Sequence, residues 1–252
     1  MTDSRPDAAP LLARALGLVP YRDALALQER AVEARATGAS GMIDTLFLLE
    51  HPPVLTAGRG TGEGSVRASD AALAGAGLEV VPVSRGGDVT WHGPGQLVGY
   101  LVCDVGARGR DLHAFLRGIE QGLIDTLADF GLESHRSAGR TGVWMGDDKI
   151  ASIGIAVRKW VTYHGFALNV RPSLAHFGLI HPCGLRGIRM TTMAERLGAA
   201  CPSWDAVLGT ASARMAGALG YAGLATASSL ALPAGAHWSE AAAPSAHTWE
   251  AA

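Results

Sequence analysis

The sequence predicts an α+β fold in which groups of neighbouring strands are separated by helices. Two observations support this class: strand-like segments follow one another with only short turns between them, and amphipathic helical stretches lie between these groups. A doubly wound parallel sheet would instead alternate strand and helix along the chain. The 252 residues, 48% of them hydrophobic, suffice for one domain with a sizeable core. No internal repeat is found.

The first half of the chain contains one helix and two strands. Residues 21–35 carry a narrow apolar stripe among charged residues and are expected to be helical. Residues 45–50 and 54–57 are expected to be strands, because both are apolar and the prolines at 52 and 53 interrupt them.

A long helix and a hairpin are expected in the second half. Asp111 can cap a helix over residues 112–130, whose apolar residues share one side. Residues 143–145 and 149–157 flank a Gly-Asp-Asp turn and predict a hairpin, which residues 160–170 continue. Three adjacent strands are therefore expected.

Two further helices are expected toward the C-terminus. Ser203 can cap a helix that runs through residue 219. Thr191 or Thr192 can cap a shorter one that runs through residue 197.

Charge and cysteine content exclude several classes of protein. A net charge of −2 provides no general attraction to nucleic acid or to a membrane surface. No apolar stretch approaches the roughly 18 residues that span a bilayer, and the first residues lack a signal-peptide pattern. Three widely spaced cysteines argue against a disulfide framework and for a reducing compartment, so we expect a cytoplasmic protein.

The most informative feature is a glycine-rich run over residues 85–96, Arg-Gly-Gly-Asp-Val-Thr-Trp-His-Gly-Pro-Gly-Gln. It lies between strand-like residues 80–83 and 97–102. Because glycine has no Cβ, it leaves main-chain N–H groups open to a ligand. This strand-loop-strand segment is therefore expected to form a ligand-binding site. The alternative is a long glycine-rich hairpin connection.

Cys183 and Lys149 are candidate catalytic residues. Cys183 lies between Pro182 and Gly184, but a free thiol has a pKa of about 8.5 and needs a positive neighbour to act as a nucleophile. Lys149 is one of two lysines in the chain, and an ammonium within about 4–6 Å would favour the thiolate. Residue type alone favours a buried loop cysteine and a solvated hairpin lysine paired to the preceding aspartates.

The remaining cysteines and histidines give weaker signals. Cys103 lies inside a strand-like segment and is expected in the core, whereas Cys201 has no basic neighbour in sequence. His92 and His164 each precede a glycine and could orient a substrate, although a structural role is equally expected for His164. No short metal-ligand spacing and no nucleotide-binding loop occur, so neither a metal nor a cofactor is expected.

Four segments together resemble the octanoyltransferases of lipoate biosynthesis: the glycine-rich run, Lys-Ile-Ala-Ser-Ile-Gly at 149–154, His-Gly-Phe-Ala-Leu-Asn-Val at 164–170 and His-Pro-Cys-Gly at 181–184. The resemblance covers roughly residues 20 to 220. It implies the fold of biotin and lipoate protein ligases, a mixed, mainly antiparallel sheet with packed helices. Composition predicts the two ends: residues 1–15 are polar and alanine-rich and are expected to be a flexible arm, and residues 223–252, rich in alanine, serine and proline, a disordered tail. A single catalytic domain is expected over residues 16–222.

The resemblance implies transfer of an octanoyl group from octanoyl-acyl carrier protein to a lysine of a lipoyl domain, such as those of 2-oxoacid dehydrogenase subunits or the glycine cleavage H protein. Cys183 would carry the acyl group as a thioester, and Lys149 would favour the thiolate and later accept a proton from the incoming amine. Exchange of one thioester for another needs no ATP. The implied substrate-binding residues are Arg85, Gly86, Gly87, Asp88, Val89, Thr90, Trp91, His92, Ser152, Ile153, Gly154, Gly165, Phe166 and Ala167.

Two features and two alternatives stay open. His181 stands where some family members have asparagine, and Arg186 and Arg189 could dock an acidic carrier protein. An ATP-dependent lipoate or biotin ligase would need no nucleophilic cysteine. A non-catalytic acyl-binding module would need neither Cys183 nor Lys149.

Overall fold

The computed structural model describes residues 9–38, 41–181 and 187–225. Eight strands form its central sheet: β1 (Leu11–Leu18), β2 (Thr45–Glu50), β6 (Gln96–Val102), β7 (His135–Ser137), β8 (Arg140–Met145), β9 (Asp148–Arg158), β10 (Val161–Asn169) and β11 (Leu224–Ala225). Their order is β11-β1-β2-β6-β10-β9-β8-β7. Strand β1 pairs in parallel with β2 and β11, and every other neighbouring pair is antiparallel. The predicted α+β fold with a mixed, mainly antiparallel sheet is confirmed.

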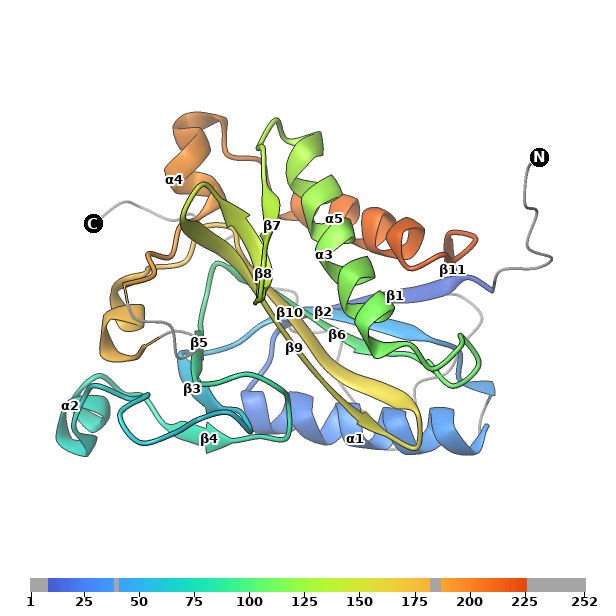
Figure 1. Cartoon of the computed structure of the whole chain (residues 1–252), viewed down its shortest axis with the longest axis horizontal. Helices are drawn as coiled ribbons and strands as arrows, with labels where there is room; N and C mark the ends of the chain where they lie inside the picture. The colour runs from blue at the N-terminus through green and yellow to red at the C-terminus, as the bar shows by residue number, and fades with distance from the viewer. Residues whose placement is uncertain (1–8, 39–40, 182–186, 226–252) are drawn as a thin grey trace.

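Long helices cover both faces of this sheet (Figure 1). They are α1 (Tyr21–Thr37) on one face, and α3 (Leu112–Asp129) and α5 (Trp204–Ala218) on the other. Side chains along a strand point alternately to opposite faces, so Leu46 and Leu48 of β2 join the core under α3 and α5, whereas Phe47 and Leu49 join the core under α1. The continuous apolar run of β2 therefore reflects burial on both faces.

A small second sheet lies beside the first. It has the order β4-β3-β5, with β3 (Val54–Ala57), β4 (Val80–Pro82) and β5 (Thr90–His92). Helix α2 (Asp70–Gly75) lies between β3 and β4 along the chain, whereas the short helices η2 (Ala175–Leu179), α4 (Met193–Leu197) and η4 (Gly198–Ala200) follow β10. A third core, which includes Leu55, Trp91 and Phe177, supports the small sheet. The glycine-rich run therefore connects two sheets, and the expected loop between two strands contains a strand of its own, β5.

Local capping signals predicted the helices well. The Asp111 carboxylate accepts a hydrogen bond from Ala114 N, and the Ser203 hydroxyl accepts one from Ala206 N, as expected for α3 and α5. Of the two threonines considered, Thr192 is the cap of α4, since its hydroxyl accepts from Glu195 N at 2.9 Å. The predicted hairpin and its continuation are confirmed as β8, β9 and β10. Among the described helices, none has the length and apolarity needed to cross a membrane.

The ends of the sheet correct the expected domain boundaries. The flexible arm over residues 1–15 is wrong for its second half, because Leu11 and Leu12 are buried and begin β1. Strand β11 lies beyond the expected boundary at 222 and pairs with β1. The sequence of β1 has no alternation of apolar and polar residues, so only its pairing with distant strands identifies it as a strand. Residues 1–8 and 226–252 lie outside the described part of the chain.

Candidate active site

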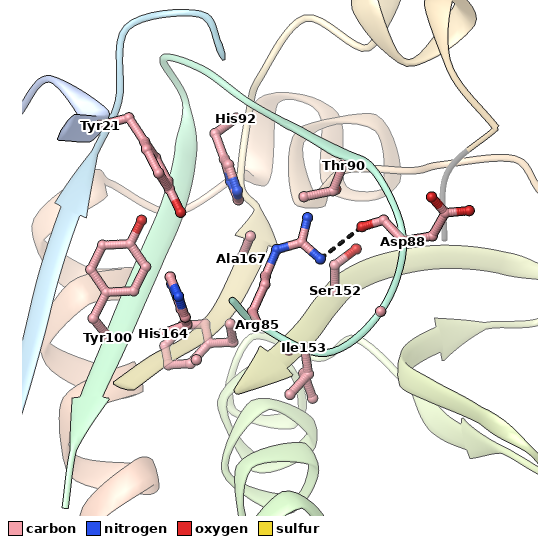
Figure 2. A pocket seen from close by; sticks show the side chains of 14 residues that line it. Tyr21, Arg85, Asp88, Thr90, His92, Tyr100, Ser152, Ile153, His164 and Ala167 are labelled. Atoms are coloured by element: carbon pink, nitrogen blue, oxygen red, sulfur yellow. Dashed lines mark hydrogen bonds between the residues drawn. The ribbon is translucent and has the colours of Figure 1, made fainter. Parts of the chain in front are cut away.

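One pocket gathers three of the predicted segments (Figure 2). Its floor is the pair of neighbouring strands β9 and β10, where Gly154 lies opposite Gly165 and Ser152 lies opposite Ala167. The glycine-rich run crosses above this floor. The lining residues are Tyr21, Arg85, Gly87, Asp88, Thr90, His92, Tyr100, Ser152, Ile153, Gly154, His164, Gly165, Phe166 and Ala167.

Most of the predicted binding residues line this pocket, and three do not. Val89 and Trp91 are buried in the third core, and Gly86 instead bonds through its N–H to the carbonyl of Ile155. Conversely, sequence reasoning missed Tyr21 and Tyr100, which come from the start of α1 and from β6. Each belongs to an apolar stripe in the sequence, and only the tertiary structure turns the hydroxyls toward the pocket (Figure 2).

Arg85 holds the glycine-rich run in shape. Its guanidinium donates to the carbonyl and hydroxyl of Thr56, at 2.7 and 2.8 Å, and to the carbonyls of Asp88 and Gly86, at 2.7 and 3.1 Å. The side chain is only 8% exposed. Because a buried guanidinium needs many acceptors, these bonds make Arg85 an organising residue of the loop as well as part of the pocket wall.

A second glycine-bounded segment lies against the same loop. Arg59 N donates to the carbonyl of Arg85, and Gly60 N donates to that of Gly87. A Cβ on Gly58 would lie 2.4 Å from the carbonyl oxygen of Gly87. Glycine at position 58 thus lets two loops approach at backbone distance.

Tyr21, Tyr100, His92 and His164 form the inner wall of the pocket, and His51 contacts this wall through Tyr100. His51 Nε2 lies 2.6 Å from the hydroxyl of Tyr100, and the other ring nitrogen lies 2.7 Å from the carbonyl of Val19. Burial raises the pKa of Tyr21 to about 12 and lowers the pKa of His51 to about 4. These groups are therefore neutral near pH 7.

His164 is the most unusual member of this wall. Its φ of 58° is rare for a residue with a side chain, and Gln28 Oε1 accepts its backbone N–H at 2.7 Å. Its ring is buried, and within the described residues neither ring nitrogen has a hydrogen-bond partner. The alternative of a satisfied structural histidine is therefore wrong for the described structure.

The buried histidines predict a loss of stability in acid. The ordinary histidine pKa is 6.5, and burial lowers that of His51 to about 4. Between these values the unfolded chain takes up a proton that the folded chain does not, so the free energy of unfolding should fall as the pH drops through this window, by up to ~1.4 kcal/mol per pH unit. Urea unfolding at about pH 7.5 and about pH 5 measures the effect.

A matched pair of variants isolates His51. His51→Gln should make the pH dependence shallower, whereas His113→Gln should not, because His113 is exposed at the start of α3. A free energy of unfolding that is equal at both pH values in the unsubstituted protein would contradict the expectation.

Lys149 is buried at the start of β9. Its side chain is 2% exposed, and Nζ lies 5.4 Å from the centre of the Trp144 ring. The alternative of a solvated hairpin lysine is therefore wrong. Asp148, considered as its partner, instead accepts hydrogen bonds from Arg189 and Arg196.

Gly142 makes room for the lysine side chain. It has a φ of 132°, and a Cβ there would lie 2.6 Å from Lys149 Cε and 2.6 Å from the carbonyl oxygen of Ala151. Gly142→Ala should therefore lower the free energy of unfolding by about 2–4 kcal/mol, through backbone strain and displacement of the lysine. Urea unfolding measures this change.

Gly139→Ala is the matched control for this substitution. Gly139 also has a positive φ, of 72°, but a Cβ there would meet nothing within 4 Å. Gly139→Ala should lower the free energy of unfolding only through backbone strain, by about 1–2 kcal/mol. Equal losses in both variants would show that the space beside Lys149 is not restricted.

Cys183 lies outside the described residues, but both flanking segments are anchored at the site. Before it, His181 N donates to the carbonyl of Ser65, whose hydroxyl donates to Asp88 at 2.8 Å. After it, the carbonyl of Arg189 accepts the N–H of Lys149 at 2.9 Å. The chain thus arrives beside the glycine-rich run and departs beside Lys149.

The two other cysteines of the chain lie in different surroundings from each other. Cys103 is fully buried, as predicted, and burial raises the pKa of its thiol to about 12. Cys201 is partly exposed, and its Sγ lies 3.6 Å from a guanidinium nitrogen of Arg171. Within the described residues, no group of three or more histidine, cysteine or acidic side chains is placed to hold a metal ion.

Comparison with known proteins gives a consistent result. The family model of the lipoyl protein ligase A/B catalytic domain matches residues 20–208. An octanoyltransferase of Geobacter sulfurreducens is 48% identical over 209 residues, which cover 83% of this chain and 82% of the relative. An octanoyltransferase of Geobacter metallireducens is 49% identical over 195 residues, covering 77% and 87%.

A solved structure supports the fold independently. The bi-partite lipoate protein ligase from Thermoplasma acidophilum superimposes with a TM-score of 0.64, over 84% of this chain and 84% of that one. The sequences are 17% identical. At that identity the likeness concerns the fold alone.

Proposed function

Because the chain belongs to the family of the lipoyl protein ligase A/B catalytic domain, we propose that it transfers octanoyl from octanoyl-acyl carrier protein to a lipoyl-domain lysine, through a Cys183 thioester. The chain is an octanoyltransferase that acts in protein lipoylation, like the relatives to which it is nearly half identical over most of its length. The carrier-bound donor and the covalent intermediate are the parts that we propose.

The observation that carries the proposal is the burial of Lys149 beside the pocket. Lys149 is the second residue of β9, the strand whose residues 152–154 form part of the pocket floor. Its backbone bonds to Arg189, on the chain that follows Cys183. Cys183 itself lies outside the described residues, and we propose that its thiol and the Lys149 ammonium act together in the transfer.

This arrangement suits a two-step transfer. The Cys183 thiolate attacks the thioester carbonyl, a new carbon–sulfur bond forms as the carbon–sulfur bond to the carrier breaks, and the Lys149 ammonium gives its proton to the departing carrier thiolate. The lysine amine of the lipoyl domain then attacks the acyl-enzyme, and the amide forms as the Cys183 thiolate departs. Lys149, having given up its proton in the first step, accepts the proton that the incoming amine loses, which restores the ammonium.

The pocket suits an unbranched acyl chain. Ile153, Phe166 and Ala167 provide apolar surface along its floor, and each buried methylene contributes about 0.8 kcal/mol. A Cβ on Gly154 would lie 2.7 Å from the carbonyl oxygen of Gly86, so the loop and the floor approach at backbone distance. Backbone N–H groups of such a loop can polarise a thioester carbonyl.

The finer features of the proposal concern partners and place. We propose lipoyl domains of 2-oxoacid dehydrogenase subunits and the glycine cleavage H protein as acceptors, in the cytoplasm. The Arg189 guanidinium donates to Asp148 and Glu195, so we propose only a small part for it in carrier docking. Arg186 lies outside the described residues, and its docking role stays a prediction.

Substrate dependence separates the proposal from its alternatives. With octanoyl-acyl carrier protein and a lipoyl domain, we expect octanoylation of the acceptor without ATP, and intact-mass analysis measures the product. Full activity with ATP and free octanoate, but none with the carrier thioester, would favour the ligase. Binding of the carrier thioester without transfer would favour the acyl-binding module.

A further inference from the structure

A chain of buried hydrogen bonds begins at the pocket. A guanidinium nitrogen of Arg85 donates to Thr56 Oγ1 at 2.8 Å, and this hydroxyl lies 3.4 Å from His92 Nε2. On the other side of the ring, His92 Nδ1 lies 2.7 Å from Gln96 Oε1. The glycine-rich run is therefore connected through His92 to the first residue of β6.

The same series of hydrogen bonds continues to the backbone of Lys149. Gln96 Nε2 donates to Asn169 Oδ1 at 2.9 Å, between two residues that face each other across β6 and β10. Asn169 Nδ2 donates to the carbonyl of Thr191 at 3.1 Å, and Thr191 N donates to the carbonyl of Lys149 at 3.0 Å. The pocket and the candidate catalytic lysine are thus joined through two side-chain amides.

The donor and acceptor groups allow only one assignment of which group donates in each of these hydrogen bonds. Because the amide nitrogen of Asn169 faces a carbonyl, its oxygen must accept from Gln96. The oxygen of Gln96 then accepts from His92, which carries its proton on Nδ1 and can accept from Thr56 on Nε2. Burial lowers the pKa of His92 well below its ordinary value, in agreement with a neutral ring.

The last hydrogen bonds of this network hold the backbone of Lys149 in place. The backbone of Lys149 is held on both sides by the segment 189–191, since Lys149 N donates to Arg189 and its carbonyl accepts from Thr191. Asn169 bonds to this segment through its side chain, and all of these contacts are buried: Asn169 is 1% exposed and Thr191 is 0% exposed. Water cannot readily replace a lost bond there.

We propose that Gln96 and Asn169 are positioning residues, which set the place of Lys149 relative to the acyl pocket. Neither residue lines the pocket, so neither contributes to holding the acyl chain directly. Their loss should therefore slow the chemical steps without weakening binding of the acyl donor. The inference rests on the proposed function, because it assumes that Lys149 takes part in the transfer.

Asn169→Leu tests the proposal by removing both side-chain bonds at similar size. We expect the rate of Cys183 acylation by octanoyl-acyl carrier protein to fall about 100-fold, the loss typical of a misplaced catalytic group, with KM changed less than about threefold. Rapid-quench intact-mass measurements give both quantities. A rate within about threefold of the unsubstituted enzyme, or a loss that appears only in KM, would overturn the proposal.

Thr126→Val is the matched control. Thr126 is also fully buried, and its hydroxyl donates to the carbonyl of Gly122 within α3. Thr126→Val therefore loses a buried hydrogen bond that is not part of the network between the pocket and Lys149. We expect it to keep the acylation rate. If Thr126→Val slowed acylation as much as Asn169→Leu does, the effect would be general destabilisation, and the proposal would be overturned.

Asn169→Asp decides the question if the leucine variant does not fold. The carboxylate still accepts from Gln96 but cannot donate to Thr191, whereas the protonated carboxyl can. The ratio of the variant's acylation rate to that of the unsubstituted enzyme should therefore rise as the pH falls. A reduced ratio that stays constant with pH, or a ratio near one throughout, would count against the positioning role.

The two proposals fail in different ways. If the unsubstituted enzyme forms no octanoyl adduct on Cys183, the proposed function fails, and the positioning role fails with it. If the unsubstituted enzyme forms the adduct and the Asn169 variants form it equally fast, only the positioning role fails.

Discussion

Replacement of Cys183 by alanine should abolish octanoyl transfer, with a loss of about 1,000-fold or more, because the proposed acyl-enzyme thioester forms on its sulfur. Cys103 is fully buried with a pKa raised to about 12, and Cys201 lies in the loop before α5. Intact-mass analysis after incubation with octanoyl-acyl carrier protein should show one octanoyl group on the unsubstituted enzyme and none on Cys183→Ala.

Cys201→Ser provides the control for this experiment. Of the two described cysteines, Cys201 is partly exposed and Cys103 is buried, so a nonspecific acylation would involve Cys201 first. We expect Cys201→Ser to keep both the adduct and the transfer rate. An adduct that persists in Cys183→Ala, or that maps to Cys201 by peptide analysis, would remove Cys183 as the nucleophile.

Lys149→Met should lower the transfer rate by about 100- to 10,000-fold, the range for loss of a general acid or base. Methionine has a similar length and can keep the contact with Trp144, so folding should be retained. Single-turnover kinetics measures the rate, and thermal unfolding followed by circular dichroism checks the fold.

The chain offers a natural control in its only other lysine. Lys159 lies at the tip of the β9–β10 hairpin, where its Nζ bonds to Glu33 at 2.8 Å and its side chain is 57% exposed. Lys159→Met should keep the full rate, since exposed ion pairs contribute little. If Lys149→Met also kept the rate, Lys149 would have no part in the mechanism.

The elements that sequence predicted correctly are those with local signals. Asp111 and Ser203 begin helices because a side-chain oxygen next to a helical apolar pattern satisfies free backbone N–H groups within the same turn. Likewise, the Gly-Asp-Asp turn closes a hairpin whose partner strand follows at once. Such signals depend on neighbours in sequence and need no tertiary context.

Elements that depend on distant pairing were missed. Strand β5 is three residues of the glycine-rich run, and it becomes a strand because Trp91 pairs with Leu55 and packs in the third core. Strand β1 pairs with β2 across a whole helix. Pairing partners far apart in the chain leave no periodic trace in either segment.

The sequence by itself determined the chemistry of this protein: a fold of hairpins and helices, a glycine-rich loop, and a cysteine and a lysine in motifs that resemble one enzyme family. Only the tertiary structure decided that Lys149 is buried, that Tyr21 and Tyr100 face the pocket, and that Gln96 and Asn169 join this pocket to the lysine. Residue types and local order set which reactions are available. Burial and hydrogen bonds between strands set where the groups lie, and these contacts form only when distant segments pack together.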